Sequence, residues 1–343
     1  MKYIFLLFIL LIFLISHAGA QRNDSIRDKY VERFPDYFFV WPVLKQRSTS
    51  FEIQQNKNRG NQLAYKPNNS YGLGFGMYLF EVGAEITFSI PVGEQKNEFF
   101  GKTKATDIQA NLLGKHWGAD VFYQRYTGFY VADANKSVAP NLPYPQRPDM
   151  STDNIGVNGI YIFNKNKFSL RSAYNFAERQ RKSAGSFLMT GTINSFQMKA
   201  DSALYGKSYE SLYGKNTAVS EFETFTIGIS PGYTHTLVAK NLFINGSLSL
   251  GPAFRNTDYV VNDIRYSSAG VDAFVDFRGA VGYNGERFFS GLSFVAQSRT
   301  VRIDETRFIS VSSTVKFLVG YRFREFGILK TRAVDLVPFG KKK

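Results

Sequence analysis

From Val43 onward, most of the chain is a series of segments in which apolar and polar residues alternate, each ending at a glycine, an asparagine or a charged turn. In Val311–Phe323 the residues of one parity are apolar, and in Val271–Tyr283 the apolar parity opposes Asp272, Asp276 and Arg278. A period of two predicts β-strands with one apolar face. Strands of about ten residues are longer than those typical of soluble sheets, so the pattern favours an all-β, transmembrane antiparallel β-barrel. The same alternation recurs at Ile155–Phe163, Phe168–Phe176, Phe225–Ile229 and Leu242–Phe254.

Short and long connections alternate along this series. Bacterial barrels have short periplasmic turns and longer outside loops, so the alternation predicts about 12 strands, provided that Gly185–Gln197 belongs to an outside loop. If that stretch pairs with a second segment in Met198–Tyr213, the total becomes about 14. The short connections are Phe80-Glu81, Gly114-Lys115, Asn164–Lys167, Ala239–Asn241 and Asn284–Glu286, and the long ones are Asn56–Asn69, Val92–Lys102, Ala132–Thr152, Glu178–Ser220, Thr257–Ala269 and Asp304–Arg307.

The two ends of the chain differ from this pattern. Lys2, an apolar run from Ile4 to Ile15 and the small residues at 18–20 have the layout of a secretory signal peptide, which we expect to cover residues 1–20. The run is too short to span a bilayer as a helix. Residues 21–42 show no clean period and are interpreted as a periplasmic lead-in or partial plug. The barrel is expected over 43–323, followed by a basic periplasmic tail over 324–343.

Composition narrows the classes of function. The chain has 33 Phe and 20 Tyr, which suits strands with aromatic girdles, and no Cys, which excludes thiol chemistry. The net charge of +14 would fit nucleic acid, but an exported chain does not meet nucleic acid. We therefore expect the partners to be outer-membrane lipid, including anionic head groups, and the barrel-assembly machinery. A solvated basic surface with no partner is the alternative.

Candidate chemistry is sparse. After the signal peptide only His116 and His235 remain, neither in a metal-binding or nucleophile motif, so we expect no metal, cofactor or catalytic residue. Both histidines follow short turns, which indicates rim positions. The polar parity of the strands gives candidates for the lumen lining, namely Asp107, Gln109, Asn111, Asn154, Asn158, Arg171, Asn175, Asp272, Asp276 and Arg278. Mixed charges of this kind either line a selective pore or pair with one another and close it.

Five short stretches, taken in order, resemble one known family. They are Tyr65-Lys66-Pro67-Asn68, Leu73-Gly74-Phe75-Gly76, Gly101-Lys102-Thr103, Tyr126-Thr127-Gly128-Phe129-Tyr130 and the run 181–187. The series resembles the exported proteins of Bacteroidota-type bacteria grouped as domain of unknown function 4421. The resemblance implies an outer-membrane barrel and carries over no site residues.

Three functions stay open at this point. The first is a non-enzymatic barrel acting as a narrow pore, a surface-binding protein or an envelope-structural protein. The second is a lipid-modifying enzyme that uses a rim histidine. The third is a secreted soluble all-β binding protein.

Overall fold

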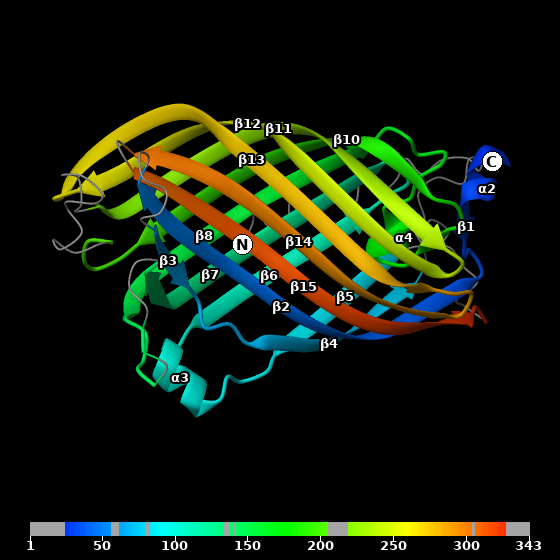
Figure 1. Ribbon diagram of the computed structural model, residues 1–343, viewed down its shortest axis with the longest axis horizontal. Coiled ribbons are helices and arrows are strands. Elements are labelled where there is room, and N and C mark those ends of the chain that lie inside the picture. Colours follow the sequence, from blue (N-terminus) through cyan, green and yellow to red (C-terminus); the bar gives the residue numbers. More distant parts are fainter. Residues whose placement is uncertain are drawn as a thin grey trace, which may run out of the picture.

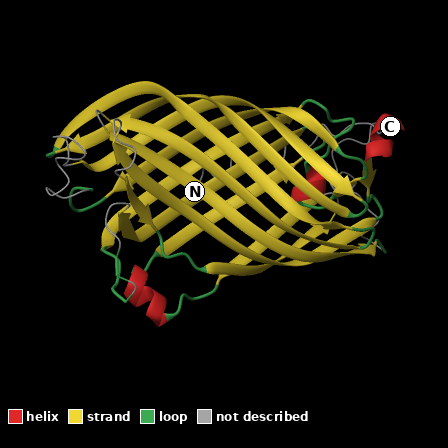
Figure 2. Cartoon of the chain, viewed as in Figure 1, coloured by secondary structure: helices red, strands yellow, loops and turns green. Residues whose placement is uncertain are grey.

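The computed structural model describes residues 25–55, 62–79, 82–133, 138–139, 141–204, 219–303 and 306–326. The expected signal peptide and most of the expected basic tail lie outside these residues. Within them the chain forms an antiparallel β-barrel of long, tilted strands (Figures 1 and 2). The three helices, α2 (Ser25–Tyr30), α3 (Glu94–Phe100) and α4 (Arg171–Tyr174), are short. None of the helices among the described residues is long and apolar enough to cross a membrane.

The barrel closes through ten strands, each antiparallel to its neighbours. In order around the ring they are β2 (Tyr37–Gln55), β15 (Thr306–Arg324), β14 (Phe288–Ile303), β13 (Ile264–Asn284), β12 (Leu242–Val261), β11 (Val219–Ala239), β10 (Ala184–Lys199), β8 (Gln146–Ile162), β7 (Trp117–Asp133) and β3 (Gln62–Lys66). The short strand β3 joins only the last few residues of β2 to those of β7.

Three further strands lie in the wall between β2 and β7, beside the parts of these two strands that β3 does not reach. β4 (Tyr71–Leu79) pairs with β2, β5 (Val82–Ser89) pairs with β4, and β6 (Lys104–Leu113) pairs with β7. In the half of the barrel where β4, β5 and β6 take the place of β3, the wall thus contains twelve strands, the number expected from the spacing of the turns. Among the described residues, no pairing joins β5 to β6.

The outward-facing residues of the barrel are apolar over only about half of the barrel's length along its axis. On β12, for example, Leu242, Leu248 and Phe254 face outward and are more than half exposed. Farther along the same face the outward residues are polar, as at Asp258. Both barrel termini and the two-residue β11–β12 turn lie at the end where the outward residues are apolar, which we call the apolar belt. In bacterial barrels the termini and the short turns lie in the periplasm, so we use the name periplasmic end for this end and outer end for the opposite one.

Three sequence-based assignments were wrong. Phe168–Phe176 is not a strand, because its apolar residues point into the barrel mouth and Arg171–Tyr174 form a helical turn. Gly185–Gln197 is not an outside loop but most of the wall strand β10, whose lumen face carries small polar residues that weaken the alternation. Thr257–Ala269 is not a long loop, because Asn262 and Asp263 adopt positive φ angles of 48° and 63° and form a tight hairpin turn.

The outer parts of the domain plan also shift. β2 begins at Tyr37, so residues 37–42, assigned to the lead-in, belong to the barrel wall. The remaining lead-in consists of α2 and β1 (Val31–Arg33), of which β1 pairs with β9 (Glu178–Gln180) across the periplasmic mouth. The plug is formed by residues 163–183 between β8 and β10, and the lead-in is attached to it through this pairing.

Candidate functional site

The middle of the lumen is filled by a network of charged and amide side chains from β7, β8, β13 and β14. Arg278 lies at its centre, where one nitrogen is 2.5 Å from an Asp120 oxygen and another is 2.8 Å from an Asp276 oxygen. Gln297 donates to Asp276 over 2.8 Å and accepts from Asn158 over 2.9 Å. All five residues are at most 7% exposed, so the network is buried and internally paired.

Two further groups extend this network toward the outer end. Arg299 donates to the Asn158 side chain and the Thr192 hydroxyl, and its guanidinium lies over the rings of Phe122 and Phe274. On neighbouring strands Arg255 and Arg302 both contact Asp272, at 2.6 and 3.0 Å. The charges expected to face the lumen thus pair with one another, which is the closing arrangement of the two alternatives weighed from the sequence.

The lumen candidates fall into two groups. Asp107, Gln109 and Asn111 lie on β6, and Asn154 and Asn158 on β8. Asp272, Asp276 and Arg278 lie on β13, and these wall residues share the lumen-facing parity of their strands. Arg171 and Asn175 lie instead on the plug, so they line the periplasmic mouth from an inserted segment and not from the wall. Asp120, Gln124, Gln297 and Arg299 were missed, although all four lie on the polar parity of β7 and β14.

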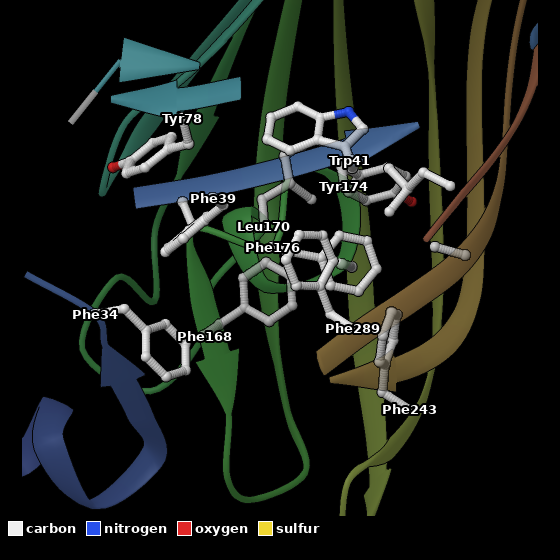
Figure 3. Close-up of a cluster of buried hydrophobic side chains, with 14 of the residues drawn as sticks. Phe34, Phe39, Trp41, Tyr78, Phe168, Leu170, Tyr174, Phe176, Phe243 and Phe289 are labelled. Atoms are coloured by element: carbon white, nitrogen blue, oxygen red, sulfur yellow. The ribbon is translucent and has the colours of Figure 1, made fainter. Parts of the chain in front are cut away.

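The periplasmic end of the lumen is closed by an apolar core between the wall and the plug. Figure 3 shows Phe168, Leu170, Tyr174 and Phe176 of the plug directed toward side chains of the wall. The Phe176 ring stacks on Phe289 with centroids 4.9 Å apart. Further wall residues of this core are Phe39, Trp41, Tyr78, Phe243 and Leu318.

Two buried arginines fix the plug. Arg322 of β15 donates to the Phe176 carbonyl and to the Asn284 side chain, both over 2.7 Å, and its guanidinium lies between the rings of Phe34, Phe39 and Phe289. Arg27 of α2 reaches the plug from the lead-in, 2.6 Å from a Glu178 oxygen. The lead-in and the barrel wall therefore hold the plug from opposite sides.

The Glu178 carboxylate ties the plug together electrostatically. Burial by itself raises the pKa of this carboxyl. The charges of Arg171 and Arg27 and the hydrogen bond from the Ser169 hydroxyl lower the pKa by more than burial raises it, so the pKa lies below its ordinary value. The stabilisation from this group is therefore complete above the unfolded pKa of about 4.3 and is lost as the pH falls through the lower, folded value.

Acidification below about pH 4.3 should therefore loosen the plug. Trp41, which is 5% exposed in the periplasmic core, reports this change, because its emission shifts to the red when water enters. The measurement uses a W117F background, which leaves Trp41 as the sole tryptophan. The E178Q variant should lack the acid transition, and an unchanged transition in that variant would show that another group controls the plug.

The outer end of the lumen is closed by a second apolar cluster. Phe51 stacks on Tyr65 of β3 with centroids 4.6 Å apart, and Phe222 lies 5.1 Å from Phe308. A cavity of about 10 Å³ separates this cluster from Asn194 and Arg299 of the polar layer, enough for one water molecule. At all three levels the lumen is thus occupied by side chains.

The two histidines lie at the periplasmic rim, as their positions after short turns indicated. His116 follows the β6–β7 turn, beside Tyr161, and partial burial with the nearby charges of Lys165 and Lys115 lowers its pKa. The His235 Nδ1 atom is 3.2 Å from the Tyr233 hydroxyl. In the part of the chain that the structure describes, neither imidazole hydrogen-bonds to a serine or a carboxylate, and no group of three His, Cys, Asp or Glu residues could hold a metal.

Comparison with solved structures returns bacterial outer-membrane barrels at very low sequence identity. Neisserial surface protein A is 7% identical, with 82% of this chain and 96% of that chain covered and a TM-score of 0.24. The translocator domain of the autotransporter NalP from Neisseria meningitidis is 8% identical, with 84% and 88% covered and a TM-score of 0.34. OmpT of Vibrio cholerae is 8% identical, with 82% and 97% covered and a TM-score of 0.27.

No curated protein matches the sequence significantly. The family comparison is specific: a model described as "Domain of unknown function (DUF4421)" matches residues 22–323. The match covers the lead-in and the barrel up to Phe323, the residue at which the strand pattern ends. The chain therefore belongs to the DUF4421 family.

Proposed function

We propose that this protein is a non-enzymatic, non-conducting barrel of the outer membrane that acts through its surfaces, as a surface-binding or envelope-structural protein. The occupied lumen carries this proposal. Apolar side chains close both ends, and the network around Arg278 fills the middle, so an ion would have to displace buried ion pairs to cross. This geometry disfavours the narrow pore.

The outer surface supports a membrane location and argues against the secreted soluble alternative. The outward residues of the belt are apolar on neighbouring strands, and a contiguous apolar surface of this extent is unfavourable in water. Export through a signal peptide cleaved after Ala20 and insertion by the barrel-assembly machinery are part of the proposal. Release of the protein from cells without detergent would contradict it.

The periplasmic rim fits anionic lipid head groups. Tyr161, Tyr233, Tyr283 and Tyr321 lie on the outward face near the short turns, where aromatic side chains meet the head groups of a bilayer. Basic side chains lie on the turns and strand ends beside them, namely Lys115, Lys165, Lys240, Arg287 and Arg324. Each such charge near an anionic surface contributes roughly 1 kcal/mol of attraction.

The lipid-modifying alternative lacks a built site. A rim histidine acting as a base requires a nucleophile within hydrogen-bond reach and a group that orients the ring. The described contacts of His116 and His235 are with tyrosines, which suits interfacial side chains. We therefore expect membrane lipid profiles to be the same in cells producing wild-type protein and the H116A/H235A variant.

Planar-bilayer recording tests the proposal directly. Refolded protein, shown to be folded by its heat-dependent mobility in SDS gels, should give no conductance steps because the lumen is occupied. An open bacterial porin recorded in the same bilayers is the positive control. Regular conductance steps from the folded protein would overturn the proposal.

A further inference from the structure

The barrel wall is interrupted within the apolar belt. Near the outer end, β3 connects β2 to β7 through Gln54–Gln62 and Lys66–Tyr130 pairing, so the wall is continuous there. Nearer the periplasm, β5 is paired only with β4 and β6 only with β7 among the described residues. We call the opening between these two strand edges the β5–β6 seam. The seam lies at the same level along the barrel axis as the outward apolar residues on the neighbouring strands.

The inner side of the seam is polar, and its polar groups form hydrogen bonds and ion pairs with basic side chains of the lumen. Arg47 of β2 donates to the backbone carbonyl of Asp107 on β6 over 3.0 Å and approaches its carboxylate at 3.4 Å. Lys45 pairs with Glu85 of β5, and Lys316 lies 3.8 Å from the same carboxylate. Basic side chains of β2 and β15 therefore contact polar groups on both strands that border the seam, which hydrocarbon could not do.

The outer side of the seam is strongly apolar. Ile86 and Phe88 of β5 are 65% and 73% exposed, and Ile108 of β6 is 64% exposed. On the closed part of the wall, Leu248 and Leu250 of β12 are 53% and 57% exposed. Other outward residues of the closed wall reach the values of the seam, with 71% at Phe187 and 64% at Val271, so the border of the seam is distinguished by its strand edges, which are unpaired among the described residues.

The outer end of the seam is covered by residues 90–103, which connect β5 to β6 and include α3. Figure 1 shows α3 projecting outside the barrel wall. Asn68 anchors the segment, because its side chain donates to the Gly101 carbonyl over 2.7 Å and its backbone NH donates to the Thr103 hydroxyl over 2.8 Å. The segment is thus held firmly at the level where the apolar belt ends.

This segment also carries unpaired positive charge. Lys96 and Lys102 of the segment and Lys104, the first residue of β6, are exposed, and none of the three forms an ion pair within the described residues. Because α3 also carries the exposed Glu94 and Glu98, the local excess of positive charge lies at Lys102 and Lys104. Lys104 is the first residue of β6 and Lys102 lies two residues before it, both on the outer side of Ile108 along the chain direction of the strand. A cationic site thus lies above an apolar one, in the order in which the phosphate and the acyl chains of an outer-leaflet lipid are arranged.

We propose that the β5–β6 seam binds a phosphorylated lipid of the outer leaflet. An acyl chain contacts Ile86, Phe88 and Ile108, and the phosphate contacts Lys102 and Lys104. The lipid covers the apolar border of the seam, while Arg47 and the lumen network satisfy the polar groups behind it. This inference deepens the proposed surface-binding function by naming one ligand class, and it rests on the membrane location.

The test measures phosphorylated lipid that stays bound to folded protein after purification in a mild, phosphorus-free detergent, by native mass spectrometry. The wild-type protein should retain about one such lipid per chain, and K102Q/K104Q should lower its apparent affinity by roughly 30-fold, from the attraction of surface lysines for anionic head groups. The K29Q/K182Q variant removes the same charge from two exposed lysines that belong neither to the seam nor to the rim, and it should retain lipid normally. Equal retention by the two variants would overturn the proposal.

A second pair of variants tests the apolar border. I86S/F88S should lose lipid, whereas L248S/L250S, which changes two equally outward residues on the closed wall, should not. Adding inorganic phosphate should not displace the ligand, and displacement would show an anion site without a lipid. Because the chain has no cysteine, a benzophenone attached to I108C can also be crosslinked in membranes, where an adduct with a second polypeptide would overturn the lipid assignment. Loss of lipid binding does not change the expected absence of conductance steps in bilayer recording. Failure of this inference is therefore distinguishable from failure of the proposed function.

Discussion

Replacing Arg278 by methionine is expected to lower the free energy of unfolding by about 3–5 kcal/mol, the usual cost of removing one partner from a buried charge network. The variant leaves the Asp120 and Asp276 carboxylates facing each other without the cation that now lies 2.5 and 2.8 Å from them. Urea unfolding in lipid vesicles, followed by tryptophan fluorescence and by gel mobility, measures the change.

The cost should come from the uncompensated carboxylates and not from the lost volume. The D120N/R278M/D276N variant removes all three charges and should recover most of the stability, because neutral amides need less solvation than buried carboxylates. If R278M is as stable as the wild type, the ion pairs do not hold the middle of the lumen. If the triple variant is no better than R278M, packing of the arginine stem explains the loss.

The barrel class could be predicted from the sequence because the wall strands have an apolar outward face and a polar lumen face in the apolar belt. In β13, Val271, Phe277 and Val281 face outward while Asp272, Asp276 and Arg278 face the lumen, so the period of two is preserved over the whole segment. β10 was missed for the opposite reason. Its lumen-facing Ser186, Thr190 and Thr192 and the glycine at 191 give little contrast between the two parities.

The plug could not be recognised from its sequence. In Phe168–Phe176 the apolar residues alternate with polar ones as they do in a strand, yet Phe168, Leu170 and Phe176 are at most 2% exposed. Alternation reports only that a segment has two kinds of surroundings, and a segment folded into a barrel mouth satisfies it as well as a wall strand does. The closed turn at Asn262-Asp263 was hidden similarly, because it is flanked by polar outward residues above the membrane.

Candidate lumen residues could be selected by parity, but their partners could not. Parity placed Arg278 inside the barrel, whereas its contact with Asp120 joins positions 158 residues apart in the chain. The interruption between β5 and β6 likewise depends on how strands distant in sequence meet. Closure of the ring by β3 decides it, and a five-residue strand gives too short a pattern to be assigned.

Replacing Arg322 by methionine is expected to destabilise the plug by about 3–5 kcal/mol, since the change leaves several buried acceptors without a donor at roughly 1–3 kcal/mol each, with losses that do not add fully. Arg322 is 0% exposed and donates to the carbonyls of Phe176 and Gly285 and to the Asn284 side chain. Its guanidinium also fills the space between three phenylalanine rings.

The R324M variant is the matched control, since Arg324 belongs to the same strand but is exposed, and its removal should change stability by less than about 0.5 kcal/mol. In the W117F background, R322M should shift Trp41 emission to the red at neutral pH, whereas R324M should leave it unchanged. An R322M variant with unshifted Trp41 emission and wild-type unfolding would mean that the apolar core alone holds the plug. If the expected result is found, Arg27 and Arg322 act as two separate attachments, because acid weakens the Glu178 contact of Arg27 while the neutral acceptors of Arg322 do not titrate.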